Sequence, residues 1–361
     1  MRYLVLACLL GLAYSCNTEY ARNQKPITEV VINPILKDTS LSIRALEIGD
    51  EFIFYGSKDH IGKYAIEKQV KISLDRLRLE QGKDHFKYVF THEDRPLHFR
   101  AIAEINGDFL AISIENPAKI YRLARKAKGP KLVYEEFHNG VFYDAMAFWN
   151  GKEGVAVGDP IDGCMSILIT RDAGHSWNKL SCDILPEAIE GEAAFAASDT
   201  NISISGDFCW IATGGVASRI LFSKDKGQSW ESIETPVIQG QATTGLYSID
   251  FYDNDLGFGI GGDYTNPNGS TNNKIITTNG GRSWRPIASG SEPGYRSCVQ
   301  FIPKSNGKEL VVTGYKGIDY SSDSGNTWIH LSDDSFYTVR FLNDSTAFAA
   351  GKEKISKLVF K

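Results

Sequence analysis

The side chains of this 361-residue chain that are best suited to ligand binding are arginines, acids and tyrosines beside short apolar runs. An arginine can hold a carboxylate through two parallel hydrogen bonds, and charged groups that converge on a concave surface favour a binding site. The alternative for each residue is an ion pair that stabilises a connection between strands. The candidates are Arg44, Arg100, Asp144, Asp159, Asp162, Glu192, Asp263, Tyr264, Tyr295 and Arg296.

The elements that would position these groups are indicated by a pattern that occurs four times. The copies are TRDAGHSWNKL (170–180), SKDKGQSWESI (223–233), TTNGGRSWRPI (277–287) and SSDSGNTWIHL (321–331). Their tryptophans are 53, 54 and 44 residues apart. Repetition at this period indicates a fold built from repeated supersecondary units.

Each position that recurs in the four copies has a mechanical explanation. The Asp or Asn can accept hydrogen bonds from amides just ahead, the Gly can adopt a positive φ, and the Trp offers a large apolar face between sheets. The pattern is therefore expected to brace a hairpin, and its acids are not expected to be catalytic. The residues are Asp172, Gly174, Trp177, Asp225, Gly227, Trp230, Asn279, Gly281, Trp284, Asp323, Gly325 and Trp328.

These four segments resemble the bacterial neuraminidase repeat, or Asp-box, and the resemblance implies a β-propeller. Pairs of apolar runs recur along residues 42–351, and counting them predicts an all-β, seven-bladed propeller of four-stranded antiparallel blades. Six or eight blades remain alternatives. The last blade lacks an outer strand, which the run ITEVVI (27–32) would supply to close the ring. Residues 27–361 would then form a single domain.

The alternating direction of the strands in each blade predicts which face of the propeller carries the binding site. In a four-stranded antiparallel blade, the turns after the first and third strands lie at one end, and the remaining connections lie at the other. The tryptophan turns follow third strands, so all ten candidate residues should emerge on the opposite face. The loops there are GDPIDG (158–163), GGDYTNPNGSTNN (261–273) and PEAIEGEAAF (186–195), and Arg340 is expected to point into the channel.

Four cysteines follow the N-terminal segment. If the first tryptophan hairpin is centred on Ala173, Cys164 and Cys182 lie opposite each other and could form a disulfide. The alternative is two buried thiols. Cys209 and Cys298 fall on inner strands of different blades and are expected to be free and buried.

Residues 1–16 resemble a bacterial lipoprotein signal. Arg2 precedes an apolar stretch, too short to span a bilayer, that leads to AYSC and ends at Cys16. The resemblance implies lipidation of Cys16, with residues 17–26 as a flexible tether. By analogy, Asn17 favours the outer membrane of a Gram-negative bacterium, with the lipid as the only membrane contact. An ordinary secretory signal is the alternative.

A second resemblance extends over roughly residues 40–361. The segments IRAL, FRAI, GDPIDG, GGDY and GYRS are similar to those of the photosystem II stability and assembly factor family and related secreted bacterial propellers. This resemblance implies a binding or assembly scaffold without covalent chemistry. Its partner would be another envelope protein or an anionic or glycan ligand, and we expect the protein to be a monomer.

The alternative function is that of a sialidase-like glycoside hydrolase, which shares the repeat and the functional face. That resemblance implies a carboxylate clamp of Arg44, Arg100 and Arg296, a nucleophilic Tyr295 or Tyr264 assisted by Glu192, and an Asp acid/base. Two features oppose it. FRAI lacks the proline of the corresponding sialidase motif, and sialidases have six blades.

No cofactor or metal is expected. The chain contains no glycine-rich strand-to-helix turn for a dinucleotide, no haem or flavin attachment pattern, and no histidine pair at metal-ligand spacing. A net charge of −5 without a basic stripe also argues against nucleic-acid binding.

Overall fold

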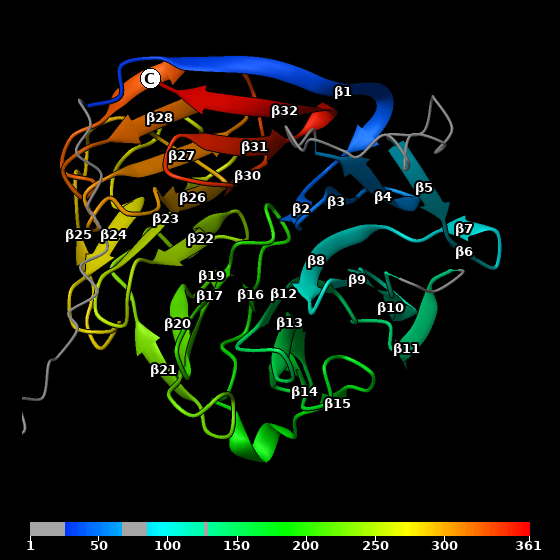
Figure 1. Cartoon of the computed structure of the whole chain (residues 1–361). Coiled ribbons are helices and arrows are strands. Elements are labelled where there is room, and N and C mark those ends of the chain that lie inside the picture. Colours follow the sequence, from blue (N-terminus) through cyan, green and yellow to red (C-terminus); the bar gives the residue numbers. More distant parts are fainter. Residues whose placement is uncertain (1–25, 67–84, 126–128) are drawn as a thin grey trace, which may run out of the picture.

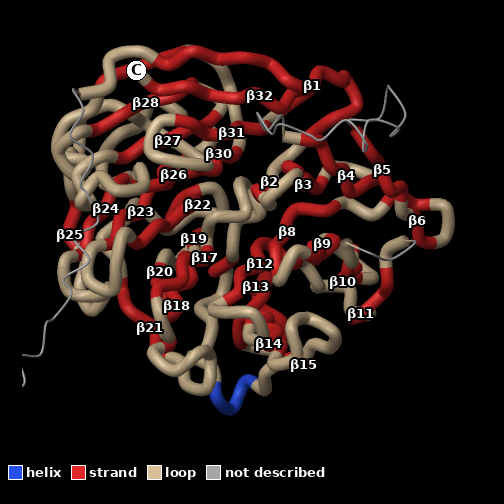
Figure 2. The backbone as a smooth tube through the Cα atoms, in the orientation of Figure 1, coloured by secondary structure: helices blue, strands red, loops and turns tan. Residues whose placement is uncertain are grey.

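The computed structural model describes residues 26–66, 85–125 and 129–361, which form a closed ring of seven radial sheets (Figures 1 and 2). The predicted signal, Cys16 and the tether up to residue 25 lie outside the described residues. Each blade is a four-stranded antiparallel sheet, which confirms the predicted seven-bladed propeller.

The blades are numbered from the N-terminus, with their strands given from the channel outward. Blade 1 comprises β2 (Ala45–Ile48), β3 (Phe52–Gly56), β4 (His60–Ala65) and β5 (His85–Val89). Blade 2 comprises β8 (Phe99–Ile105), β9 (Asp108–Ser113), β10 (Ala118–Leu123) and β11 (Lys131–Glu136). Blade 3 comprises β12 (Tyr143–Phe148), β13 (Gly154–Ile161), β14 (Cys164–Thr170) and β15 (Asn178–Lys179). Blade 4 comprises β17 (Ile202–Ser205), β18 (Phe208–Ala212), β20 (Arg219–Ser223) and β21 (Glu231–Glu234), and blade 5 comprises β22 (Thr244–Phe251), β23 (Gly257–Asp263), β24 (Lys274–Thr277) and β25 (Arg285–Pro286). Blade 6 comprises β26 (Cys298–Phe301), β27 (Leu310–Gly314), β28 (Gly317–Ser321) and β29 (Ile329–Ser332). Blade 7 comprises β30 (Thr338–Phe341), β31 (Thr346–Ala350), β32 (Lys352–Phe360) and β1 (Val30–Ser42).

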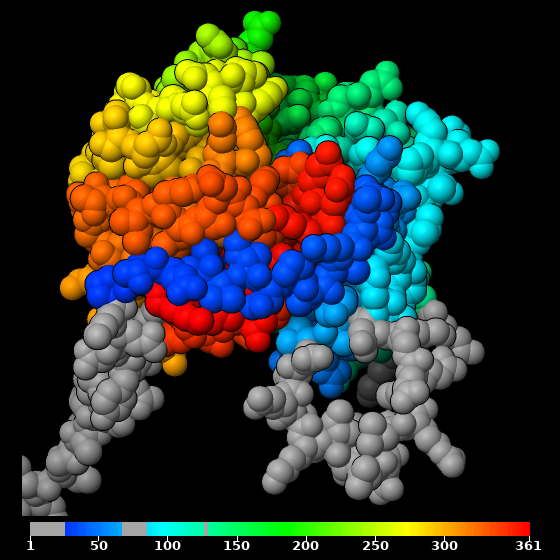
Figure 3. Space-filling model, turned by 90° about the horizontal axis from the view of Figure 1, so that it is seen from above, coloured from blue at the N-terminus to red at the C-terminus, as the bar shows by residue number. Residues whose placement is uncertain are grey.

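The ring is closed by the N-terminal strand. β1 pairs antiparallel with β32 from Val30 opposite Phe360 to Ser42 opposite Lys352. Figure 3 shows β1 running along the outside of the last blade. The predicted closure is therefore present, and the blade that begins with β30 gains its outer strand from the start of the chain.

Several shorter elements lie outside the four-stranded blades. β6 (Thr91–His92) and β7 (Arg95–Pro96) form a hairpin between blades 1 and 2. β16 (Glu192–Ala193) and β19 (Gly214–Gly215) extend blade 5 on its channel side. The 3₁₀ turn η2 (Cys182–Ile184) precedes β16. No helix in the described ranges is long and apolar enough to cross a bilayer.

The apolar core lies between neighbouring blades, where the tryptophan turns contribute to it. Trp177 is 6% exposed and packs edge-on against Phe148, with ring centroids 5.8 Å apart. Asp172 accepts a 2.9 Å hydrogen bond from the amide of Ser176, and Gly174 has a φ of 76°. The third copy is equivalent, because Asn279 accepts from the amide of Ser283 at 3.1 Å. These contacts explain the residue types of the repeated turn.

Candidate functional site

The strand order divides the connections between two ends of the propeller. We call the end with the loops between second and third strands and the crossovers between blades the loop face. We call the other end, with the tryptophan turns, the turn face. All ten candidate residues lie at loop-face ends of strands or in loop-face connections.

The channel is filled near the loop face by residues 195–201, which we call the plug. The plug follows β16 and rises in the centre of the ring (Figure 1). Arg44 of blade 1 and Arg100 of blade 2 each donate a 3.4 Å hydrogen bond to its carbonyl groups, and Thr338 of blade 7 donates one of 2.9 Å. Asp199 accepts from two backbone amides, of β8 at 2.8 Å and of β12 at 3.2 Å. The plug thus joins inner strands from different sides of the ring.

The two arginines therefore form part of the channel wall. The Arg44 guanidinium lies 4.2 Å from the ring centroid of Tyr337. Burial and the neighbouring Arg44 charge lower the pKa of Arg100. Their hydrogen bonds to plug carbonyls give both arginines a structural role that the sequence pattern did not indicate.

The carboxyl groups of Asp144, which is buried, and Asp159, which is half-buried, interact electrostatically beside the plug. Asp144 is fully buried, and neither of its oxygens makes a hydrogen bond of good geometry. Burial and the charge of Asp159 raise the pKa of Asp144 well above its usual range. Asp159 accepts a 2.9 Å hydrogen bond from the amide of Ala194, and burial raises its pKa to about 6.

Glu192 and Arg296 are held in buried ion pairs. Glu192 lies 2.6 Å from Arg219, with side chains 0% and 7% exposed. Arg296 lies 2.6 Å from Asp319, with side chains 4% and 5% exposed. For these two candidates, the structure shows the alternative role, because each forms an ion pair with a strand residue, Arg219 of β20 or Asp319 of β28.

Three of the other loop-face candidates, Asp263, Tyr264 and Tyr295, lie around Tyr247, whereas Asp162 lies in another loop. Tyr295 is buried and packs edge-on against Tyr247, with centroids 4.8 Å apart. Tyr264 is 48% exposed. Asp263 closes its own turn by accepting from the amide of Thr265 at 2.9 Å. Asp162 is an exposed turn residue with a φ of 55°. Of the set implied by the sialidase resemblance, Glu192 and Arg296 are therefore engaged in ion pairs and Tyr295 is buried, while Arg44 lies beside Arg100.

The structure contains the Cys164–Cys182 disulfide, with a Cα–Cα distance of 5.5 Å. The expected geometry was wrong, because β14 and β15 pair Leu168 with Lys179 and Cys182 lies beyond them in η2. The bond therefore joins the start of β14 to the crossover that leads to the plug. Cys209 and Cys298 are free and buried.

A feature that the sequence pattern did not reveal is the distribution of exposed apolar side chains. Eleven large hydrophobic residues are exposed in the described part of the chain, and eight of them belong to the loop face. These eight are Val89, Phe137, Ile184, Ile189, Val216, Ile238, Tyr264 and Tyr315. Single apolar residues in loops have no periodicity, so the sequence alone offers no signal for this surface.

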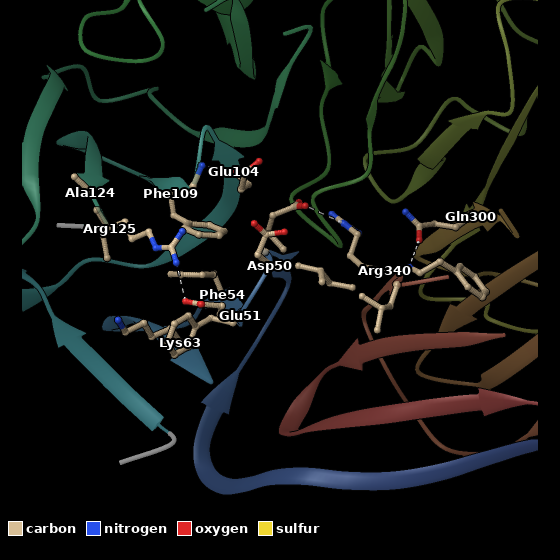
Figure 4. Close-up of a pocket in the computed structure, with 18 of the residues that line it drawn as sticks. Asp50, Glu51, Phe54, Lys63, Glu104, Phe109, Ala124, Arg125, Gln300 and Arg340 are labelled. Atoms are coloured by element: carbon tan, nitrogen blue, oxygen red, sulfur yellow. Dashed lines mark hydrogen bonds and ion pairs between the residues drawn. The ribbon is translucent and has the colours of Figure 1, made fainter. Parts of the chain in front are cut away.

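The turn face opens into a cavity of about 860 Å³ (Figure 4). Inner strands contribute one polar residue each to its wall: Glu47, Glu104, Asp250, Gln300 and Arg340. As expected, Arg340 lines the channel; it donates a 2.9 Å hydrogen bond to the carbonyl of Asp199 in the plug and lies 3.9 Å from Glu47. Burial raises the pKa of Asp250 to about 7. Across the described ranges, no three His, Cys, Asp or Glu side chains are grouped to hold a metal ion.

Comparison with known proteins gives structural relatives only. No protein-family model and no curated protein matches the chain. A structure of YCF48 bound to D1 peptide is 12% identical, with a TM-score of 0.62 over 93% of this chain and 100% of the other. YCF48 from Cyanidioschyzon merolae is 10% identical, with a TM-score of 0.62 over 92% and 98%. The WD40 propeller domain of Doa1 is 11% identical, with a TM-score of 0.59 over 92% and 97%. At these identities the likeness shows a shared fold.

Proposed function

We propose that this protein is a cell-envelope scaffold that binds a segment of another envelope protein on its loop face, without covalent chemistry. The observation that carries the proposal is the concentration of exposed large apolar side chains on that face. Apolar residues gathered on one surface and rimmed by polar groups mark protein-binding sites. The other face exposes fewer of them, among them Ile329 and Leu342.

The fold supports a role in protein binding. One of the similar propellers was solved as YCF48 bound to D1 peptide, so a propeller of this shape can hold a peptide. The four tryptophan turns, which we take to be neuraminidase-type repeats, would then serve only to brace the blades.

The N-terminal sequence supports a location for this role. We propose that residues 1–16 direct export, that Cys16 is lipidated, and that the propeller is held at the outer membrane of a Gram-negative bacterium as a monomer. Lipidation of Cys16 would be seen as a mass increase of the mature protein that is absent in Cys16→Ser.

Affinity purification from detergent-solubilised envelope tests the binding role. We expect a partner that co-purifies with the native protein to be lost from the double variant Val216→Ser/Tyr264→Ser. The matched control Ile329→Ser/Leu342→Ser removes two apolar side chains that do not belong to the loop face and should retain it. Loss from the control with retention by the loop-face variant would reverse the assignment of the binding face.

A further inference from the structure

The exposed apolar residues over blades 3 to 6 belong to loops that hydrogen-bond to one another in series. The amide of Val216 donates to Gly191 at 2.9 Å, and that of Gly240 donates to Gly215 at 3.1 Å. The amide of Ile238 donates to Asn272 at 2.9 Å, and the Tyr315 hydroxyl donates to the carbonyl of Tyr264 at 2.6 Å. The loops therefore form one continuous surface.

We call the exposed side chains on this surface the apolar band. Its members are Ile189, Val216, Ile238, Tyr264 and Tyr315, each between 38% and 48% exposed. Because hydrogen bonds between the loops hold them in place, a bound partner would gain contact with little ordering of this protein.

One end of the band borders an acidic hollow of about 510 Å³ over blade 3. Its lining includes Asp159, Glu190 and Ile189, so the hollow and the band share a residue. None of the described residues that line it is basic. Glu192 also lines the hollow but is neutralised by Arg219, which leaves Asp159 and Glu190 to face a ligand.

The walls of this hollow are fixed to the ring. The amide of Ala188 donates a 2.8 Å hydrogen bond to Gly163, and Cys164 pairs with Glu187 as an isolated bridge. The Cys164–Cys182 disulfide ties the same crossover to blade 3. The hollow is therefore a formed feature of the surface.

We propose that the partner segment is extended and carries an arginine or lysine followed by apolar residues. The basic side chain occupies the acidic hollow, and the apolar side chains lie on the apolar band. This inference rests on the proposed loop-face function and adds the chemistry of the partner. A guanidinium or ammonium between two carboxyl groups makes the strong, charge-assisted hydrogen bonds that select a basic side chain.

Three labelled twelve-residue peptides test this chemistry by fluorescence anisotropy with the purified protein. The first has an arginine followed by alternating leucine and serine, the second has glutamate in place of arginine, and the third has serine in place of every leucine. We expect the first to bind and the other two to bind at least about tenfold more weakly, because one lacks the charge and the other the apolar contact.

Substitutions in the protein separate the two contacts. We expect Glu190→Gln to weaken binding of the first peptide about five- to tenfold at low salt, with a smaller effect at high salt because the exposed charge is screened. Val216→Ser should weaken it at both salt concentrations. Glu93→Gln, an equally conservative change in the β6–β7 turn on another part of the ring, should leave binding unchanged.

Three results would overturn the inference: no binding of the first peptide, preference for the glutamate peptide, or no effect of Glu190→Gln. Each would leave the scaffold function standing if the envelope partner is still lost from Val216→Ser/Tyr264→Ser. Retention of that partner by the double variant would instead remove the loop-face function itself.

Discussion

Removal of Arg219 should destabilise the protein strongly, because it leaves the Glu192 carboxylate buried without its cation. Arg219 donates to Glu192 through Nε at 3.1 Å and Nη2 at 2.6 Å, and Nη2 also reaches the carbonyl of Glu187 at 2.8 Å. Breaking a buried ion pair at one partner costs about 3–5 kcal/mol. We therefore expect Arg219→Met to lower the free energy of unfolding by about that amount.

The double variant Glu192→Gln/Arg219→Met separates the cost of the uncompensated charge from lost packing. Without either charge, and with a glutamine that still accepts from Thr213, the loss should fall below about 2 kcal/mol. Equilibrium urea unfolding followed by tryptophan fluorescence measures the free energy of unfolding of the single and the double variant. The dependence of this free energy on urea concentration should be unchanged if the native fold is intact.

The exposed pair Arg125–Glu51 provides the matched control. Its side chains are 59% and 55% exposed, so Glu51→Gln should cost less than about 1 kcal/mol. The reasoning fails if Arg219→Met costs no more than Glu51→Gln, or if the double variant loses the sum of its two single changes.

Three further outcomes are expected. Reduction of Cys164–Cys182, which spans 18 residues, should lower the free energy of unfolding by about 3 kcal/mol; an unchanged urea midpoint with reductant would contradict this. Asp172→Ala removes the acceptor of the Ser176 amide and should cost about 1–2 kcal/mol, whereas Asn279→Asp should stay within about 0.5 kcal/mol, as thermal unfolding would show. Because burial raises the pKa of Asp250 to about 7, the native state holds a proton that the unfolded chain releases near pH 4. The resulting stabilisation is complete below about pH 4 and is lost as the pH rises through 7, so Asp250→Asn should flatten this part of the stability profile; an unaltered profile would refute it.

Much of the fold could be predicted because its information is local. A tryptophan turn needs its Asp or Asn, its Gly and its Trp within a few residues, so four copies are visible in the printed sequence. The paired apolar runs then give the blade count, and the missing outer strand predicts that β1 completes the last blade. Strand parity further placed the candidate residues on one face.

The candidate site was less predictable, because its contacts join residues far apart in the chain. Arg44 donates a hydrogen bond to the carbonyl of Ala197, which is 153 residues away in the sequence. No local pattern around either residue indicates that a plug occupies the channel. Glu192 is an acid in a predicted loop and was therefore a candidate, but its ion pair with Arg219 depends on how the crossover that contains β16 packs against β20. The disulfide was expected from opposed strands, whereas its actual geometry depends on a 3₁₀ turn that the spacing does not show.

Because β1 pairs with β32, the last blade cannot be completed before residues 352–360 have been synthesised. Until then, residues 30–42 lack the strand with which they pair. During this interval, the edge of the final blade is open to pairing with other chains. A truncation of even the last ten residues should therefore yield an aggregating product instead of a slightly smaller propeller.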